Sequence, residues 1–469
     1  MDTPIEFGTD GWRDTLDTFT TPRIKMVAQA VADYLREEAD RAGDTVAVGY
    51  DARESSPGFA EDVAEVLAAN GFDVLVAERD CPTPVTAWTI VDRDLAGAMV
   101  ITASHNPPEY NGVKYIPENG SPALPEVTEG LEARLREPDP LPGAEHGDIK
   151  EVDFTETYYE HALDLLEPDL SDLTVVYDAM HGSGRGVTDE LLERGGATVH
   201  RRRCERDPDF GGTPPEPSAE NLEELVAAVR EHDADLGVAN DGDADRIAVV
   251  TPARGFLDEN LFFAGLYDYM LEDDDGPAVR TVSTTFLIDR IAEAHGQTVA
   301  EVPVGFKWIA QAMEERDALM GGEESGGFSI RGHVREKDGV LMALLASVAT
   351  ADRSLDERID TLLAEYGEIH QDRRNLDCPD SEKDRVVGEI EQALPETVAG
   401  VTVETVNDAD GFKILLEDGS WLLARPSGTE PKLRIYAEAD SADRVDALLD
   451  AGVDIVEPII RNSGANPQL

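Results

Sequence analysis

The chain has 469 residues, of which 98 are acidic and 40 are basic, so its formal net charge at pH 7 is −58. This charge disfavours nucleic acid and anionic membranes as partners, because both would repel the chain. There is no apolar run near the ~20 residues of a transmembrane helix, and the three cysteines are widely spaced. We expect no signal peptide and a cytoplasmic protein.

The acidic residues are spread over the whole chain, and only eight of the 40 basic residues are lysines. An acidic surface with few lysines is typical of adaptation to molar salt, where charge repulsion is screened over ~3 Å. We therefore predict a halophilic protein whose unfolding midpoint rises between low and molar KCl. Half of the lysines fall in or beside the motifs described below, which suggests an anionic ligand. These are Lys114, Lys307, Lys337 and Lys432.

The first part of the chain alternates strands and helices, which indicates a parallel α/β domain. The predicted elements are a strand leading into a glycine-punctuated loop over 5–13, helices over about 21–42 and 56–70, and strands over 45–53, 72–77 and 96–101. A proline-rich linker over 138–143 ends this part. Since single cores stop growing near ~250–300 residues, more than one domain is expected.

The α/β pattern then repeats before the character of the chain changes. A second unit is predicted from a helix over 154–166, a strand over 173–179, a helix over 219–231 and a strand over 236–239. A third begins near Arg246, with helices over 260–271, 285–295 and 309–315. Strands over 401–406, 411–416, 421–425 and 433–438 and a helix over 442–456 predict an α+β domain with an antiparallel sheet.

Ser104 follows the buried strand over 96–101, in Thr102-Ala103-Ser104-His105-Asn106-Pro107. A rigid scaffold would present such a serine to a substrate. Taken alone, a loop of this kind is more often an ordinary proline-terminated turn.

Asp241, Asp243 and Asp245 occupy alternate positions between two predicted strands. Alternating carboxylates can converge on a hard divalent cation. An EF-hand is excluded, because Arg246 stands where its glycine is needed and Pro252 where its glutamate is needed. Catalytic Mg²⁺ fits the pattern, and an acidic surface turn is the alternative.

Two further loops suit a phosphorylated sugar. In Gly321-Gly322-Glu323-Glu324-Ser325-Gly326-Gly327, Glu323 and Ser325 could hydrogen-bond vicinal hydroxyls, although a glycine-rich turn is equally compatible. The stretch from Arg425 to Arg434 combines hydroxyls, a glycine and cations, as a phosphate cradle does, with a hairpin loop as the alternative. Together the four motifs indicate phosphoryl transfer on a phosphosugar.

With these motifs in this order, the chain resembles the α-D-phosphohexomutase superfamily over essentially its whole length. The resemblance implies three similar mixed-sheet α/β domains and a smaller C-terminal α+β domain around a central cleft. The corresponding boundaries are 1–145 with the serine loop, 146–248 with the metal loop, 249–366 with the sugar loop and 367–469 with the phosphate loop.

The resemblance also implies roles for individual residues. The implied catalytic set is Ser104, His105, Lys114, Arg13 and His333, with Lys114 and His333 as alternative proton-transfer groups. Mg²⁺ would be held by Asp241, Asp243, Asp245 and a phosphate oxygen on Ser104. The implied substrate-binding set is Arg246, Lys307, Glu323, Ser325, Arg425, Ser427, Gly428, Thr429 and Arg434.

The implied reaction interconverts hexose 1-phosphate and hexose 6-phosphate through phosphorylated Ser104, with a hexose 1,6-bisphosphate as intermediate and activator. Glucose is favoured, because the sugar loop together with His333-Val334-Arg335-Glu336-Lys337-Asp338-Gly339 is similar to the phosphoglucomutase branch. The bispecific phosphomannomutase type ends its sugar loop in histidine where Gly327 stands, and phosphoglucosamine mutases usually carry Gln or Met where Glu324 stands. Mannose and glucosamine phosphates are the alternatives.

Three other functions compete with a mutase. A serine hydrolase using Ser104 and His105 would lack the Gly-x-Ser-x-Gly turn. A non-catalytic sugar-phosphate-binding protein would not need the serine and the aspartates together, and a Mg²⁺-dependent phosphatase would release phosphate faster than it isomerises. We expect a small-molecule phosphosugar as the partner, with no nucleic acid and no membrane, and a monomer or a homodimer.

Overall fold

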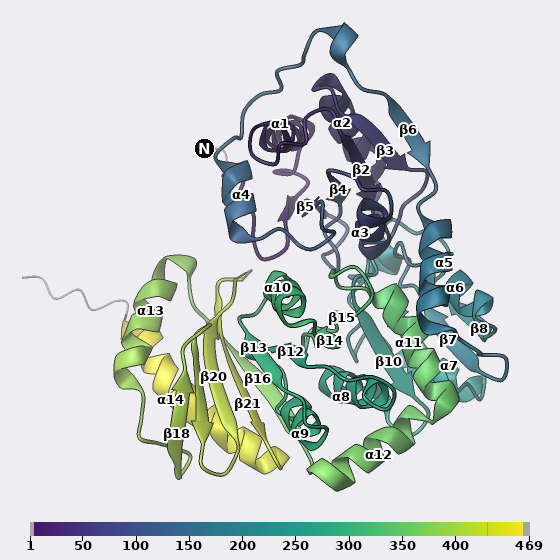
Figure 1. Ribbon diagram of the computed structural model, residues 1–469. Coiled ribbons are helices and arrows are strands. Elements are labelled where there is room, and N and C mark those ends of the chain that lie inside the picture. The colour runs from purple at the N-terminus through teal and green to yellow at the C-terminus, as the bar shows by residue number, and fades with distance from the viewer. Residues whose placement is uncertain (1–3, 429, 463–469) are drawn as a thin grey trace, which may run out of the picture.

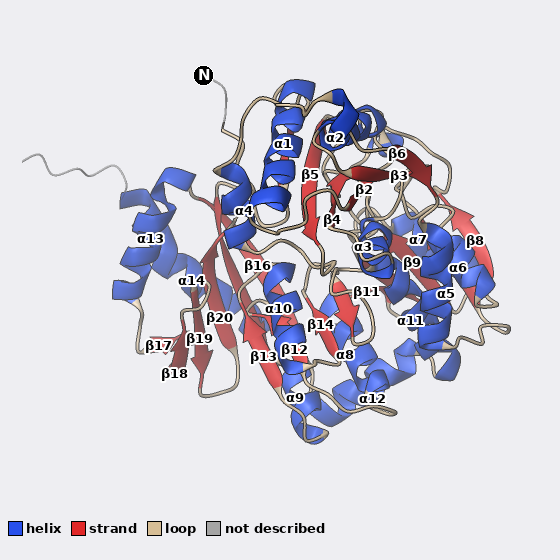
Figure 2. Cartoon of the chain, turned by 45° about the horizontal axis from the view of Figure 1, so that its top comes forward, coloured by secondary structure: helices blue, strands red, loops and turns tan. Residues whose placement is uncertain are grey.

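The computed structural model describes residues 4–428 and 430–462. Four β-sheets follow one another along the chain, and helices pack against them (Figures 1 and 2). In Figure 1 the first unit lies at the top, the second at the right, the third at the bottom centre and the C-terminal unit at the left. The predicted fold class, three mixed-sheet α/β domains and an α+β domain, is confirmed.

The first sheet has six strands in the order β1-β5-β4-β2-β3-β6. Its unit comprises β1 (Trp12–Thr15), α1 (Thr21–Glu37), β2 (Thr45–Tyr50), α2 (Ser56–Ala69), β3 (Asp73–Ala77), α3 (Thr83–Asp92), β4 (Gly97–Ile101), β5 (Tyr110–Pro117), α4 (Pro125–Glu132) and β6 (Ile149–Val152). Strands β4, β2, β3 and β6 are parallel, whereas β5 and β1 add antiparallel pairings at one edge.

The second and third sheets have the orders β11-β10-β9-β7-β8 and β13-β12-β14-β15. The second unit comprises α5 (Thr155–Leu166), β7 (Thr174–Asp178), α6 (Thr188–Arg194), β8 (Thr198–Arg202), α7 (Glu223–Glu231), β9 (Leu236–Asn240), β10 (Ile247–Thr251) and β11 (Gly255–Leu257). The third comprises α8 (Glu259–Met270), β12 (Ala278–Thr281), α9 (Leu287–Ala294), β13 (Val299–Val302), α10 (Phe306–Arg316), β14 (Met320–Gly322), β15 (Phe328–Ile330), α11 (Gly339–Asp352) and α12 (Leu355–Tyr366).

The three α/β sheets share one plan. In each, a buried parallel strand (β4, β9 or β14) pairs with the antiparallel strand that follows it along the chain (β5, β10 or β15). The loop at each reversal carries one of the motifs: the serine after β4, the aspartates after β9 and the sugar loop after β14. The repeated topology therefore presents three different chemical groups from equivalent positions.

The fourth sheet is antiparallel throughout, in the order β16-β21-β20-β19-β18-β17. Its elements are β16 (His370–Asp377), α13 (Asp380–Ala393), β17 (Thr397–Val398), β18 (Val401–Asn407), β19 (Phe412–Leu416), β20 (Trp421–Pro426), β21 (Lys432–Ala439) and α14 (Ala442–Arg461). The phosphate motif forms the turn between β20 and β21.

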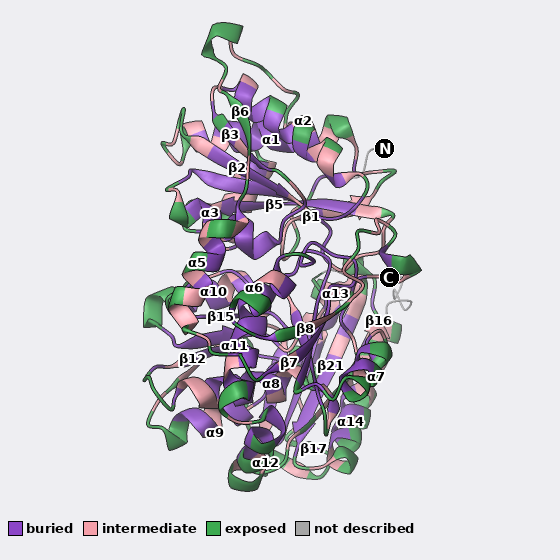
Figure 3. Ribbon diagram, turned by 90° about the vertical axis from the view of Figure 1, so that its right-hand side faces the viewer, coloured by how far each residue is buried: buried purple, intermediate pink, exposed green. Residues whose placement is uncertain are grey.

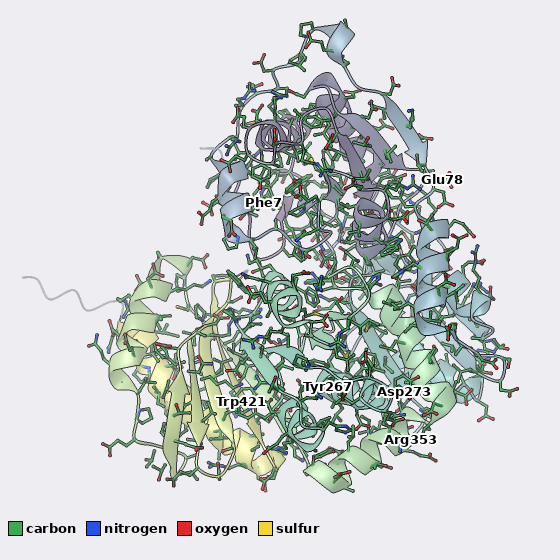
Figure 4. All side chains as sticks on the ribbon, viewed as in Figure 1. Phe7, Glu78, Tyr267, Asp273, Arg353 and Trp421 are labelled. Carbon is green, nitrogen blue, oxygen red and sulfur yellow. The ribbon has the colours of Figure 1, made fainter. Side chains whose placement is uncertain are left out.

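The hydrophobic cores divide the molecule unequally. One continuous cluster joins the first three units, running from Ala47 to Leu362 through α11, almost all of which is buried. The burial pattern is visible in the purple strands of Figure 3. The C-terminal unit has its own core, and Trp421, labelled in Figure 4, joins it to the third unit through a small cluster with Val282 and Tyr436. The first three units thus form one packed body, to which the fourth is attached.

The structure corrects several predicted elements and boundaries. The predicted N-terminal strand lies after its glycine loop, at Trp12–Thr15, because these residues pair with β5. Strand β6 joins the first sheet although it follows residue 145, and β10 and β11 belong to the second sheet although the boundary was predicted at 248. Hydrophobic patterning identifies a strand but not its partner, so these boundaries fell too early.

Candidate active site

Ser104 lies where the chain leaves β4, and its side chain faces the metal loop. Its φ of 49° is in the left-handed region, which non-glycine residues rarely adopt. Its backbone N–H donates to Thr102 Oγ1 over 2.8 Å, and its hydroxyl donates to Asp241 Oδ2 over 2.6 Å. His105 Nδ1 lies 3.2 Å from the same hydroxyl. The sequence-predicted serine and the first predicted metal ligand are therefore in direct contact.

The three aspartates predicted to bind metal form one buried cluster. Oxygens of Asp241, Asp243 and Asp245 lie within 4.8 Å of one another. A Cβ on Gly242 would lie 2.5 Å from the carbonyl oxygen of Ser104, so glycine is needed for the two loops to approach. Asp243 Oδ1 and Asp245 Oδ1 are buried without a hydrogen-bond partner among the described residues. Converging carboxylates with unpartnered oxygens fit a hard divalent cation such as Mg²⁺.

The carboxylates of this cluster are electrostatically unequal. Burial, with the adjacent Asp243 and Asp245, holds the pKa of Asp241 well above its usual range. Burial acts on Asp243 in the same direction, but the ammonium of Lys114, the hydroxyl of Thr83 and the charge of Arg13 together outweigh it and lower the pKa of that carboxyl. Nearby cations therefore stabilise the negative charge of Asp241, which faces Ser104, less than that of Asp243.

Two lysines place positive charge beside the aspartates. Lys114 Nζ lies 2.9 Å from Asp10 Oδ2, 3.0 Å from Asp243 Oδ2 and 2.7 Å from Asp245 Oδ2. Lys337 Nζ lies 3.0 Å from Asp10 Oδ2 and 3.2 Å from Asp245 Oδ2. Burial alone would lower the pKa of Lys114, but these carboxylates raise it well above its usual value. In this arrangement Lys114 is a cation that can donate a proton, not a base.

Arg13, His105 and Arg246 surround the serine and the aspartates. Arg13, on β1, donates to Asp10 Oδ2 and to Asn106 Oδ1, each over 3.4 Å. The backbone N–H of Arg246 donates to Asp241 over 3.1 Å. Burial, reinforced by the charges of Arg246 and Arg13, holds the pKa of His105 well below its usual value, so its ring is neutral.

The sugar loop borders a cavity. Glu323 Oε1 accepts a hydrogen bond from the backbone N–H of Gly305 over 3.0 Å, and Ser325 Oγ donates to Glu323 Oε2 over 3.3 Å. Lys307 lies in the first turn of α10 and is half-buried, which lowers its pKa. The cavity has a volume of about 290 Å³ and reaches the second, third and fourth units. Its charged lining is Glu216, Arg246, Asp258, Glu259, Glu324, Asp372 and Arg373.

The phosphate loop approaches the first unit. A Cβ on Gly428 would lie 3.1 Å from Thr9 Oγ1, so this turn of the fourth unit touches the N-terminal loop. Arg425 Nε donates to Asp410 Oδ2 over 3.0 Å, and Arg434 pairs with Glu430.

Hydrogen bonds also hold the backbone of this loop. The backbone N–H of Ser427 donates to the carbonyl of Lys432 over 2.8 Å. Lys383 Nζ donates to the carbonyls of Ser427 and Glu430 from α13. Thr429, predicted as a phosphate ligand, lies outside the described residues.

Comparison with known protein families assigns all four units. The α/β/α domains I, II and III of phosphoglucomutase/phosphomannomutase match residues 4–141, 154–255 and 258–366, and the C-terminal domain of the same family matches 375–455. The chain belongs to the phosphoglucomutase/phosphomannomutase family. It is thus an enzyme of the phosphohexomutase type, an isomerase, as its sequence predicted.

Relatives in this family carry several names. A protein of Methanopyrus kandleri named "Probable phosphoglucosamine mutase" is 34% identical over 96% of this chain and 97% of its own length. A protein of Thermococcus kodakarensis named phosphopentomutase is 33% identical over 97% of this chain and 99% of its own. A crystal structure from Thermus thermophilus, whose name assigns it provisionally to the phosphomannomutases, is 34% identical, with a TM-score of 0.84 over 97% of this chain and 100% of its own.

The structure does not bring His333, a predicted proton-transfer residue, to this family site. Its Nε2 hydrogen-bonds Asp338 Oδ2 over 2.8 Å, and its ring stacks with His161 and Trp88. His333 is buried at the junction of α3, α5 and the loop before α11. His333 therefore packs beneath the site, although Lys337, four residues later, lies in it. Spacing along the sequence could not separate these two positions.

Sequence reasoning also missed residues that the structure places in the site or against its loops. Lys337 was singled out by the scarcity of lysines but was given no place in the site, and Asp10 stood unremarked beside Arg13 in the N-terminal loop. Lys383 and Arg53 lie far from the motifs in sequence and carried no signal.

In the part of the chain that the structure describes, no helix combines the length and the hydrophobicity that a membrane span requires.

Proposed function

We propose that the protein interconverts hexose 1-phosphate and hexose 6-phosphate through a phosphorylated Ser104 and a hexose 1,6-bisphosphate. The observation that carries this proposal is the contact of Ser104 Oγ with Asp241 Oδ2 at 2.6 Å, inside a cluster of three aspartates and two lysines. Phosphoserine brings about −1.5 to −2 charges. Because three carboxylates already face two ammonium groups here, offsetting that charge calls for the divalent cation that the aspartates would hold.

The chemistry is an exchange of phosphorus–oxygen bonds. A hydroxyl of the bound sugar phosphate attacks the phosphorus on Ser104, the Ser104 Oγ–P bond breaks, and a bisphosphorylated sugar forms. The hydroxyl proton must leave, and His105, whose ring is neutral, is one acceptor beside Ser104. After the sugar turns over, its other phosphoryl group is returned to Ser104, so atoms and charge balance over the cycle.

The residues of the chain divide the remaining work. Asp241, Asp243 and Asp245 would hold Mg²⁺, which when bound neutralises phosphoryl oxygens and orients the transfer. Lys114, whose ammonium donates to Asp243 and Asp245 of the same cluster, is proposed as the proton donor to the leaving serine oxygen. Glu323 and Ser325 are proposed to hold sugar hydroxyls. The second phosphate is assigned to the loop of Arg425, Ser427, Gly428 and Arg434.

Glucose phosphate is the first proposed substrate, because the loop from Gly321 to Gly327 and the segment that contains Lys337 are similar to those of the phosphoglucomutase branch. Glucosamine phosphate is the second, and two observations favour it. The Methanopyrus kandleri relative is named "Probable phosphoglucosamine mutase". The cavity beside Ser325 also has five carboxylates against two arginines in its lining, which suits an ammonium substituent on the sugar.

One coupled assay tests the reaction and the sugar together. Glucose 1-phosphate, glucosamine 1-phosphate, mannose 1-phosphate and ribose 1-phosphate would each be supplied with Mg²⁺, high KCl and a trace of the matching bisphosphate. Values of kcat/KM rank the sugars. Ser104→Ala should abolish turnover, whereas Ser171→Ala, at an exposed serine that hydrogen-bonds Asp169, should not change it. Undiminished isomerisation by Ser104→Ala would falsify the phosphoserine route, and phosphate release faster than isomerisation would favour a phosphatase.

A serine hydrolase is less compatible with the site. Ser104 Oγ and His105 Nδ1 are 3.2 Å apart, but no carboxylate hydrogen-bonds the His105 ring in the described ranges. The Ser104 hydroxyl donates to Asp241 instead of to a histidine oriented by an acid. A fluorophosphonate probe should leave Ser104 unlabelled.

A further inference from the structure

Arg53 lies directly beneath the serine loop, although it is about fifty residues away in sequence. Its side chain follows β2 and is 1% exposed. Three of its hydrogen bonds go to carbonyl oxygens of the loop between β4 and β5, and a fourth goes to the first residue of β5. These acceptors are the carbonyls of Ser104 at 2.8 Å, Asn106 at 2.7 Å, Pro107 at 2.6 Å and Tyr110 at 3.2 Å.

The carbonyls of Ser104 and Asn106 need a partner from outside the loop. They lie between Ile101, where β4 ends, and Tyr110, where β5 begins, so no neighbouring strand supplies one, whereas the carbonyl of Pro107 also accepts the N–H of Tyr110 over 3.1 Å. Ser104 also has a φ of 49°, which the loop must hold against the preference of a non-glycine residue. A planar guanidinium with five N–H donors can bind several carbonyls at once, as an ammonium cannot.

The guanidinium is itself held in place by a carboxylate that reaches the serine by a second path. Asp51 Oδ2 accepts from Arg53 Nε over 2.9 Å and from Thr102 Oγ1 over 2.8 Å. The Thr102 hydroxyl in turn accepts the N–H of Ser104. The second unit covers this network, because the ring of Phe210 lies 5.0 Å from the Arg53 guanidinium. Both the N–H and the C=O of Ser104 are thus tied to one buried ion pair.

We propose that Arg53 is a positioning residue for phosphoryl transfer, which fixes the backbone of Ser104 so that its oxygen meets the sugar hydroxyl in line. The proposal rests on the proposed function, since it assumes that Ser104 carries the phosphoryl group. Among the described residues, Arg53 hydrogen-bonds neither the aspartate cluster nor the phosphate loop. Its substitution should therefore alter the position of Ser104 and leave these two sites in place.

The test compares Arg53→Lys and Arg53→Met with the wild type and with Arg358→Lys. Arg358 is an equally buried arginine, paired with Asp268, Glu272 and Asp352 in the third unit, and serves as the matched control for loss of a buried guanidinium. Each protein is phosphorylated with labelled glucose 1,6-bisphosphate at high KCl. The folded fraction is isolated by gel filtration, and transfer of label to glucose 6-phosphate is followed in a single turnover.

Arg53→Lys should slow transfer on the order of 10²-fold, the loss expected from a misplacement of about 1 Å, while KM stays within about threefold. Arg53→Met should be slower still, so that lysine restores part of the rate, and Arg358→Lys should transfer at the wild-type rate. The proposal is overturned if folded Arg53→Lys transfers within about threefold of the wild type, or if KM rises while the transfer rate holds. A wild type that acquires no label on Ser104 would instead remove the proposed function.

Discussion

The serine loop and the phosphate loop are both turns between antiparallel strands, yet they are held very differently. The serine loop is bound by a fully buried arginine, and its hydroxyl faces a buried carboxylate. In the phosphate loop, Lys432 and Glu430 have side chains 34% and 42% exposed. The serine belongs to the body formed by the first three units, whereas the phosphate loop belongs to the attached fourth.

This difference matches two different tasks in the proposed reaction. The bond-making oxygen must be held within a fraction of an ångström, because small misplacements cost large factors in rate. The anchor must accept either end of a bisphosphorylated sugar and then release it, which suits a loop on a separately attached unit. Changes on the serine side should therefore lower kcat, and changes on the phosphate side should alter KM.

Asp243→Asn should have the largest effect, because it should impair catalysis at the serine loop. Loss of one carboxylate removes a cation ligand and unbalances Lys114, so we expect kcat to fall by more than the roughly 10–100-fold typical of residues that only orient a ligand. Steady-state kinetics over a Mg²⁺ titration measure this, with Mn²⁺ binding by electron paramagnetic resonance alongside. Glu231→Gln, at an exposed position of α7, is the control. Unchanged Mn²⁺ binding and kcat would remove Asp243 from the metal site.

The attachment of the fourth unit can be probed through Lys413. Its buried Nζ lies 2.7 Å from Glu301 Oε2 and 4.4 Å from the centre of the Trp421 ring. Burial, with the charge of Arg280, lowers the pKa of Lys413 to about 8. The unfolded chain then binds more protons between about pH 8 and the usual lysine pKa of about 10.4, so this group makes stability rise with pH in that window.

We expect the rise due to Lys413 to be on the order of 3 kcal/mol. Because other groups titrate in the same range, the quantity to measure is the difference between wild type and Lys413→Met in urea unfolding at about pH 7.5 and about pH 11, on either side of that window. The variant should be the more stable protein at the lower pH, and the difference should shrink at the higher pH. Parallel pH profiles would contradict a buried charge at this position.

Lys383→Gln should act on the phosphate side. Its ammonium holds the carbonyls of Ser427 and Glu430, so its loss should loosen the loop and raise KM about tenfold, the effect of about 1.4 kcal/mol, with kcat within about twofold. Lys383→Arg should retain most of the affinity. Lys25→Gln, which breaks a partly exposed pair with Asp62, is the control. A fall in kcat with constant KM would erase the contrast between the two loops.

Glu430→Gln should have the smallest effect and the opposite sign. The Glu430 carboxylate pairs with Arg434 and Lys432, and under the proposed function it would compete with a substrate phosphate for both. Exposed pairs contribute up to about 1 kcal/mol, so KM should fall about threefold at low salt and less in molar KCl. Glu417→Gln, exposed in the same unit, should leave KM unchanged. A higher KM would mean that Glu430 orders the loop instead of competing with the ligand.

The parallel strands and their helices could be read from the sequence, because β2, β4 and β9 are apolar runs. The antiparallel strands β5 and β16 could not. Strand β5 contains Asn111 and Lys114, whose polar side chains are buried only because other segments supply their partners. Strand β16 is largely charged and sits at the edge of the fourth sheet. Tertiary contacts, not local pattern, make these segments strands.

The four motifs were legible because each concentrates its chemistry in a few adjacent residues. Ser104 and the aspartates indeed meet, although 137 positions separate Ser104 from Asp241. Asp10 and Arg53 were missed because their importance comes from partners on other strands. His333 was misassigned because proximity to a motif in sequence does not fix which side of the chain faces the site.

Gly327 and Lys337 cannot vary independently. A Cβ on Gly327 would lie 2.6 Å from Cδ and 2.9 Å from Cγ of Lys337, whose ammonium is fixed by Asp10 and Asp245. Any side chain at 327 therefore displaces the lysine. A histidine there would require the methylenes of Lys337 to shift and would strain the pairing of its ammonium with Asp10 and Asp245. Substitutions at these two positions should therefore be energetically coupled, so the order in which they are exchanged would matter.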